Sequence, residues 1–146
     1  MTAWRTHLLD TEAEITALLE RTRSVAVLGI KPPGPGVPAH YVPEYAQQAG
    51  MRIIPVPVYY PEVTHFLGES ALRTVAAIGE RSDLVNVFRR PSDIPPHLPD
   101  LLAARPKAVW FQLGIRNDDA AEQLARAGID VVQDRCLLVE LQDRGR

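Results

Sequence analysis

Five short runs of apolar residues recur along the chain, and stretches with helical spacing or loop composition separate them. The runs cover residues 24–30, 51–58, 83–88, 108–113 and 129–132. Continuous apolar runs of this length are typical of strands buried on both faces of a parallel sheet. We therefore predict five buried strands.

The stretches between these runs predict helices. Residues 11–22 carry apolar side chains at helical spacing, and Asp10 or Thr11 provides an N-cap. Pro38 suits the first turn of a second helix, which runs to about residue 49 and stops at Gly50. Further helical segments are predicted over 69–78, from Ser92 or Asp93 to 103, over 118–127 and over 134–141.

Alternation of strands and helices predicts an α/β fold with right-handed crossovers. We expect a three-layer, Rossmann-like, doubly wound and mostly parallel five-stranded sheet in the order 3-2-1-4-5. The whole chain, 1–146, is predicted to be one domain with its core at about 14–140. In such sheets a ligand binds beyond the carboxyl ends of the strands.

Composition narrows the function. A net charge of −2 argues against a nucleic-acid partner bound through a basic face, and one cysteine excludes an internal disulfide. No signal peptide and no apolar stretch of about 20 residues is evident, so we expect a cytoplasmic protein with no membrane partner.

The loop after the first strand is rich in glycine and proline. It begins Gly29-Ile30-Lys31-Pro32 and leads to a predicted helix that contains His40 and Tyr41. Backbone amides at such a helix start suit a phosphate, and Lys31 adds a positive charge. A proline-stiffened surface loop with no ligand explains the same composition equally well.

The end of the second strand is apolar. The residues Pro55, Val56, Pro57 and Val58 stand where a ribose-binding carboxylate is expected for NAD. In addition, the glycines of the loop after the first strand do not have the G-x-G-x-x-G spacing of NAD-binding proteins. This disfavours a nicotinamide dinucleotide. The apolar walls would suit a flat adenine ring.

Two arginines follow the third strand directly after Phe88. Arg89 and Arg90 lie where an anion would bind, and a guanidinium binds phosphate through two hydrogen bonds. Surface salt bridges with Asp93 or Glu62 are the alternative interpretation.

The sequence contains no constellation that we assign to catalysis, and the four histidines lack metal-ligand spacing. Cys136 is either a nucleophile at a strand exit or a small buried apolar side chain. Trp110 and Phe111 are expected in the core. We therefore assign no catalytic residue and no metal ligand.

Five segments in order resemble one family. They are Val25-Ala26-Val27-Leu28-Gly29, the stretch from Gly50 to Val56, the stretch from Val85 to Pro91, the stretch from Val109 to Ile115, and Val131-Val132-Gln133-Asp134-Arg135-Cys136. Together they resemble the CoA-binding-domain proteins related to the nucleotide-binding part of the succinyl-CoA synthetase α subunit. The similarity covers roughly residues 14–140.

The resemblance implies coenzyme A in the cleft at the strand ends. It places the pyrophosphate on the loop from Gly29 to Tyr41 and adenosine near Pro55 to Pro57. The remaining wall would come from the third and fourth strand ends. The full expected set is Gly29, Ile30, Lys31, Pro32, His40, Tyr41, Pro55, Val56, Pro57, Phe88, Arg89, Arg90, Gln112, Leu113 and Gly114.

We therefore expect a non-catalytic protein that binds CoA or acyl-CoA and works beside a separate acyl-CoA enzyme. The further domains that catalyse the ligase reaction in that family are absent from this sequence. Two alternatives stay open. One is an oxidoreductase or acyl transferase that uses Cys136, and the other is a degenerate Rossmann scaffold that acts through protein contacts alone.

Overall fold

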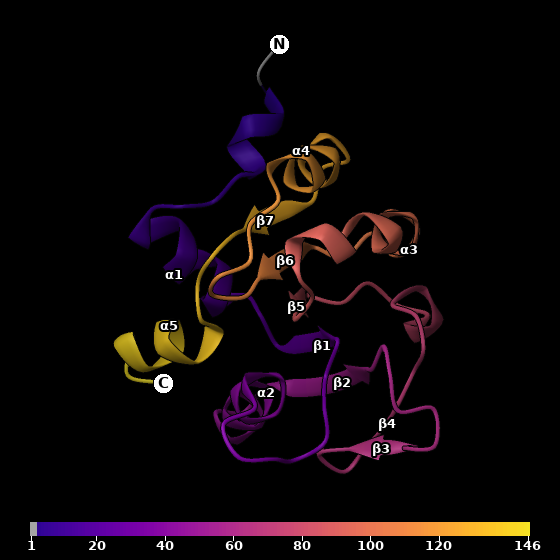
Figure 1. Cartoon of the computed structure of the whole chain (residues 1–146). Coiled ribbons are helices and arrows are strands. Elements are labelled where there is room, and N and C mark those ends of the chain that lie inside the picture. The colour runs from indigo at the N-terminus through magenta and orange to yellow at the C-terminus, as the bar shows by residue number, and fades with distance from the viewer. Residues whose placement is uncertain (1–2) are drawn as a thin grey trace.

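The computed structural model describes residues 3–146, which form a parallel sheet of five strands with helices on both faces (Figure 1). Each strand lies within one of the five predicted runs, so these predictions are confirmed. The strands are β1 (Ser24–Leu28), β2 (Arg52–Val56), β5 (Leu84–Val87), β6 (Ala108–Phe111) and β7 (Asp130–Val132).

The α/β, doubly wound fold class is confirmed, but the strand order differs from the expected one. The observed order is β2-β1-β5-β6-β7, which places the third predicted strand beside the first and not beyond the second. The segment after β2 passes over one face of the sheet, where Leu72 and Val75 pack, and returns the chain to the free side of β1. Hydrophobic periodicity identifies strands but carries no information about which strands are neighbours.

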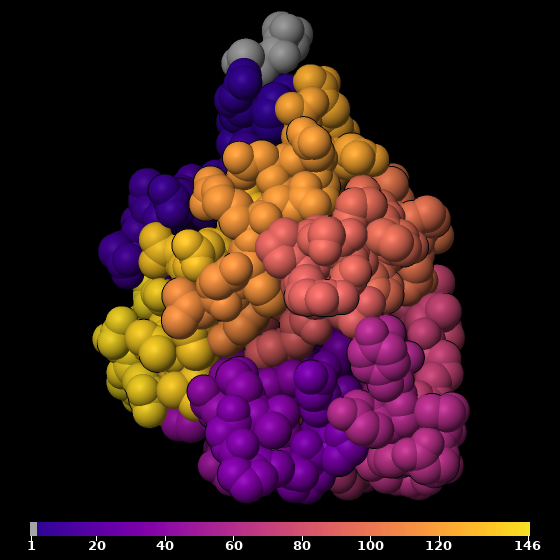
Figure 2. Space-filling view, in the orientation of Figure 1, coloured from indigo at the N-terminus to yellow at the C-terminus, as the bar shows by residue number. Residues whose placement is uncertain are grey.

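The helices divide into two layers. On one face lie α1 (Glu12–Glu20), α2 (Pro38–Gln48) and α5 (Leu137–Asp143), and on the other lie α3 (Leu98–Ala104) and α4 (Asp118–Arg126). Alternate strand residues feed the two cores, so the neighbours Trp110 and Phe111 are both fully buried but on opposite faces. The α5 helix (yellow) lies between α1 (indigo) and α2 (purple) in Figure 2.

Helix ends follow the predicted signals. Thr11 caps α1 by accepting a hydrogen bond from the amide of Glu14, whose carboxylate accepts one from the amide of Thr11. Pro38 is the first residue of α2, and Gly50 follows that helix with φ +100°.

The predicted helix over 69–78 is wrong. This stretch contains β4 (Glu69–Ser70), which pairs with β3 (His65–Phe66), and a 3-10 turn at Ala76–Ile78. Tertiary contacts determine this shape, since the Asp100 carboxylate accepts hydrogen bonds from the amides of Val75 and Ala76. The helix expected from Ser92 or Asp93 begins later, because prolines divide its first part into two 3-10 turns before α3.

The segment before α1 covers the edge of the sheet. After a 3-10 helix at Ala3–His7, Leu8 bridges Val131 in parallel, and the Leu9 amide donates to the Val131 carbonyl at 2.8 Å. This segment covers backbone groups that the edge strand β7 would otherwise expose. Among residues 3–146 no helix is both long and apolar enough to span a bilayer.

Candidate functional site

The strand order places a crevice at the carboxyl ends of β1 and β5. The chain leaves β1 toward β2 on one side and later forms β5 on the other, which is the topological switch point where doubly wound proteins bind ligands. A cavity of about 250 Å³ opens there. We call it the cleft, and its lining is Gly29, Ile30, Lys31, Val58, Tyr59, Phe88, Arg89, Arg90 and Asp93.

Gly29 allows the two strand ends to approach. Its φ is +90°, and a Cβ built on it would lie 2.4 Å from the carbonyl oxygen of Phe88. The Gly29 amide donates to Val56 at 2.9 Å, and the Phe88 amide donates to Leu28 at 2.9 Å. Only glycine fits this floor without a backbone shift.

Arg89 is the most constrained cation of the cleft. Its Nε donates to Nε2 of His97 at 3.1 Å, and its guanidinium lies 5.5 Å from the centre of the Tyr59 ring. Asp93 is 3.9 Å away, and only 15% of the side chain is exposed. These contacts hold the guanidinium at the cleft wall.

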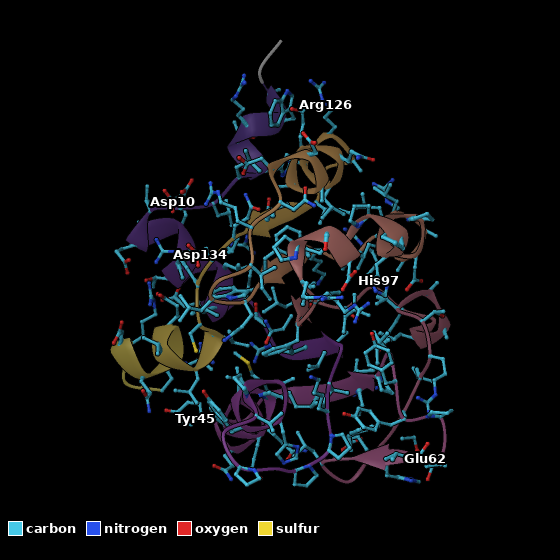
Figure 3. The ribbon with its side chains drawn as sticks, viewed as in Figure 1. Asp10, Tyr45, Glu62, His97, Arg126 and Asp134 are labelled. Atoms are coloured by element: carbon cyan, nitrogen blue, oxygen red, sulfur yellow. The ribbon has the colours of Figure 1, made fainter. Side chains whose placement is uncertain are left out.

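His97 accepts a hydrogen bond from Arg89. Arginine can only donate, so Nε2 of His97 is the acceptor, which fits a neutral ring with its proton on Nδ1. Burial lowers the pKa of His97, and the charge of Arg89 lowers it further, against weaker opposing effects of Asp100 and Asp93. Figure 3 labels His97 beside α3.

The cleft carries more positive than negative charge. Arg90 is 81% exposed, and its Nε bonds to the Asp93 carboxylate at 2.9 Å. That ion pair raises the pKa of Arg90. The lining therefore holds three cations and one carboxylate: Arg89 and Arg90 pair with Asp93, and Lys31 makes no salt bridge within residues 3–146. Of the two salt-bridge partners suggested by the sequence, the structure shows Asp93.

The strand residues Pro55, Val56 and Pro57 are buried in and just after β2. Pro55 is tolerated because β2 is an edge strand, and its carbonyl accepts the amide of Leu72 at 2.9 Å. Gln112 is also buried, with its Oε1 accepting from Asn86 and from the Leu137 amide. These predicted site residues support the strand ends and do not line the cleft.

The Gly- and Pro-rich loop turns away from the cleft after Lys31. Pro32 and His40 line a separate apolar pocket beside the β3–β4 hairpin, and His40 Nδ1 lies 3.1 Å from the Lys31 carbonyl. The amides of His40 and Tyr41 both donate to the Val37 carbonyl at 3.0 Å. These two amides are therefore engaged within the first turn of α2.

A second hollow lies at the ends of β6 and β7. Two cavities of about 400 and 390 Å³ share Asp10, Arg116 and Gln133, and we call them together the side groove. Leu113 is 64% exposed there, while Gly114 donates its amide to Asp134 at 2.7 Å. Cys136 lines this groove and is absent from the lining of the cleft.

The side groove is larger than the cleft but has the opposite charge. Two arginines and five carboxylates line it, and Arg135 is already held by Asp10, Glu12 and Glu140. Asp10 and Asp134 are both labelled in Figure 3, beside the segment that leads into α1. An anionic ligand is favoured in the cleft and disfavoured in this groove.

Sequence interpretation missed Tyr59 and His97. Tyr59 directly follows the predicted second strand, and an aromatic side chain at a strand exit was the signal available. His97 contacts Arg89 from the turn before α3, which no local pattern indicates. No group of three or more His, Cys, Asp or Glu side chains within residues 3–146 is placed to hold a metal ion.

Comparison with known proteins places the chain in a family. Residues 23–142 match the CoA binding domain family. The chain is 34% identical over 128 residues to the uncharacterized protein YneT of Bacillus subtilis, covering 88% of this chain and 92% of that protein. The structure of cell-free ID.343 from Thermus thermophilus superposes with a TM-score of 0.83 at 40% identity, over 92% of this chain and 98% of the other. A hypothetical protein from Pyrococcus horikoshii OT3 gives a TM-score of 0.82 at 26% identity, over 92% of each chain. The chain belongs to the CoA binding domain family.

Proposed function

We propose that this protein binds coenzyme A, free or acylated, in the cleft and performs no covalent chemistry on it. The observation that carries the proposal is the charge of the cleft, where Lys31, Arg89 and Arg90 face one carboxylate. CoA has a pyrophosphate and a 3′-phosphate, and guanidinium groups bind phosphate with good geometry. The protein would act as a carrier or sensor beside a separate acyl-CoA enzyme.

The same cleft favours CoA over NAD. A ribose diol is held by a carboxylate in NAD-binding proteins, whereas β2 is followed here by Pro57, Val58 and Tyr59, none of which is acidic. The one carboxylate in the lining, Asp93, is engaged by Arg90. A cleft with spare cations and no free carboxylate suits a ligand with an additional phosphate.

The cavity holds part of CoA and leaves the rest at the surface. Its volume of about 250 Å³ is just below the range of roughly 300–1,000 Å³ that is usual for small-molecule pockets. We infer that the nucleotide phosphates lie beside Arg89 while the pantetheine arm extends over the exposed strand ends. Ile30 and Phe88 would supply apolar contact at the floor.

Titration calorimetry with CoA, dephospho-CoA and NAD tests the proposal. A hydrogen bond to a charged group contributes about 1.5–3 kcal/mol, so loss of the 3′-phosphate or an Arg89→Ala substitution should weaken binding about tenfold or more. Arg116→Ala is the matched control, because Arg116 is an exposed arginine of the side groove. Tightest binding of NAD would overturn the CoA assignment.

The absence of catalysis is tested with the purified protein and acyl-CoA. Cys136 lies in the side groove and outside the cleft lining, so we expect no thioester hydrolysis above the rate in buffer. Hydrolysis that disappears in a Cys136→Ser variant would show that the protein is an enzyme.

A further inference from the structure

The loop after β2 is fixed by one arginine. The Arg73 guanidinium donates to the carbonyl oxygens of Tyr59, Tyr60 and Pro61 at 3.3 Å each, and to that of Val63 at 2.8 Å. All four acceptors belong to a stretch of five residues. No secondary structure holds residues 59–63, so this side chain replaces the hydrogen bonds that a helix or strand would supply.

The two tyrosines of this loop have different environments. Tyr60 adopts φ +63°, and its partly buried side chain packs against the core on the face of the sheet that α1, α2 and α5 cover. Tyr59 is 56% exposed and lines the mouth of the cleft. The packing of the partly buried Tyr60 and the Arg73 hydrogen bonds together keep the Tyr59 ring at the surface, where hydrophobic burial alone would not hold it.

The exposed ring faces the constrained cation of the cleft. Arg89 lies 5.5 Å from the centre of the Tyr59 ring, and its Nη1 is 3.5 Å from the Tyr59 hydroxyl. An aromatic face beside fixed cations is the combination that binds nucleotides, because bases stack on the ring while phosphates meet the cations.

We propose that Tyr59 is the surface on which the purine base of the ligand stacks, and that Arg73 is the positioning residue that holds Tyr59 over the cleft. This inference rests on the proposed function, since it assigns a subsite to the same cleft. The base then lies on the β2 side, and the phosphates lie beside Arg89 on the β5 side.

Substitution of Tyr59 tests the stacking subsite. Tyr59→Ala should weaken binding of CoA and of adenosine 3′,5′-bisphosphate about tenfold, since base–aromatic stacking contributes a few kilocalories per mole at most. Inorganic pyrophosphate has no base, so its inhibition constant as a competitor of CoA should differ less than twofold between Tyr59→Ala and the wild type. Tyr59→Phe keeps the ring and should recover most of the affinity lost in the alanine variant.

A spectroscopic signature separates stacking from a structural role. With ring-labelled tyrosine, the NMR signal that disappears in Tyr59→Phe should move upfield when adenosine 3′,5′-bisphosphate is added. The signals of the other three tyrosines should move much less. A Tyr59 signal that stays in place on saturation would overturn the stacking subsite.

Arg73 is tested by its effect on the same signal. Arg73→Ala should weaken CoA binding about three- to tenfold, because the loop must then be ordered on binding, and should shrink the upfield shift of Tyr59. Arg73→Lys cannot donate to four carbonyls in one plane and should lie between the alanine variant and the wild type. Arg81→Ala is the control, because Arg81 donates to a single carbonyl, that of Arg105, outside this loop.

CoA binding in the cleft and stacking of the base on Tyr59 can be tested separately. If wild-type protein binds no CoA, the proposed function and this subsite both fall. If CoA binds and Arg89→Ala weakens it, but Tyr59→Ala and Arg73→Ala bind like wild type, only the subsite and its positioning residue are wrong.

Discussion

The cleft and the side groove lie at the carboxyl edge of one sheet, and both are lined by arginines that follow strands. In the side groove each arginine has carboxylate partners, and Arg135 alone has three. In the cleft Arg89 and Arg90 share Asp93, and Lys31 has no salt bridge within residues 3–146. An arginine at a strand end therefore indicates a ligand only when the local charges do not already balance.

The largest effect is expected from breaking the buried ion network of the side groove. Glu140 bonds to Arg135 and Arg144, and all three side chains are largely buried. Glu140→Ala should lower the free energy of unfolding by about 3 kcal/mol, the low end for a broken buried pair, because Glu12 still contacts both arginines. Urea denaturation measures this change.

Glu122→Ala is the control for that network. Glu122 pairs with Arg126 on the exposed surface of α4, so its loss should cost no more than about 0.5 kcal/mol. Equal, small losses in the two variants would show that the arginines of the side groove are not fixed by their partners, and the contrast with the cleft would disappear.

A glycine substitution at each hollow is expected to have the next largest effect. Gly29 and Gly114 have similar positive φ values of +90° and +84°, so alanine at either position costs about 1–2 kcal/mol of backbone strain. Gly29→Ala also places a Cβ against the Phe88 carbonyl, whereas no atom lies within 4 Å of a Cβ at Gly114. We expect Gly29→Ala to be about 1–3 kcal/mol less stable than Gly114→Ala in thermal or urea unfolding.

CoA binding by these two variants sharpens the contrast. Gly29→Ala must shift the strand ends that form the cleft floor, so it should lose CoA affinity even where it remains folded. Gly114→Ala should bind CoA as the wild type does. The opposite pattern would place the ligand at the side groove.

The sequence was sufficient for the strands and for part of the cleft. Residues such as Gly29 and Arg89 could be assigned because a residue that directly follows a strand of a parallel sheet lies at the carboxyl edge of that sheet, where ligands bind. The order of the strands was not predictable in this way, since it depends on the path of residues 57–83 across one face. Leu113 and Gln112 follow the same positional rule, but one lines the side groove and the other is buried.

Contacts between distant segments explain the residues that were missed. Arg89 meets Tyr59 thirty positions earlier and His97 eight positions later. Neither contact has a local signature, because the loop that carries Tyr59 is shaped by Arg73 and the turn that carries His97 is shaped by prolines. The charge balance of each hollow likewise emerges only when such partners are in place.

A smaller effect is expected on the pH dependence of the free energy of unfolding, through His97, which contacts Arg89 of the cleft and does not line the side groove. Burial and the Arg89 charge hold the pKa of His97 in the folded protein below the usual value of 6.5, which applies to the unfolded chain. At a pH between the lowered pKa and 6.5, the unfolded chain therefore binds more protons than the folded one. This contribution to stability is complete above pH 6.5 and is lost as the pH falls through the lowered pKa. Urea denaturation at pH 7.5 and pH 5.5 measures the loss.

His97→Gln should reduce that pH dependence, because glutamine keeps an acceptor for Arg89 Nε but does not titrate. His65→Gln, at an exposed histidine of the β3–β4 hairpin, is the control for the exchange of a histidine for glutamine outside the cleft. Equal pH dependence in wild type and His97→Gln would mean that His97 does not couple the cleft wall to pH.

The smallest effect is expected from neutralising one carboxylate at each hollow. Asp93→Asn removes the negative charge that Arg89 and Arg90 share, and should strengthen CoA binding about two- to fivefold, the scale of an exposed ion pair of up to about 1 kcal/mol. Asp118→Asn frees Arg116 in the side groove and should leave CoA affinity unchanged. Calorimetry at 50 mM and 200 mM salt adds a second measure, since the gain in Asp93→Asn should shrink as salt screens the cleft. A gain in Asp118→Asn as large as that in Asp93→Asn would show that net charge alone, and not the balance within the cleft, governs binding.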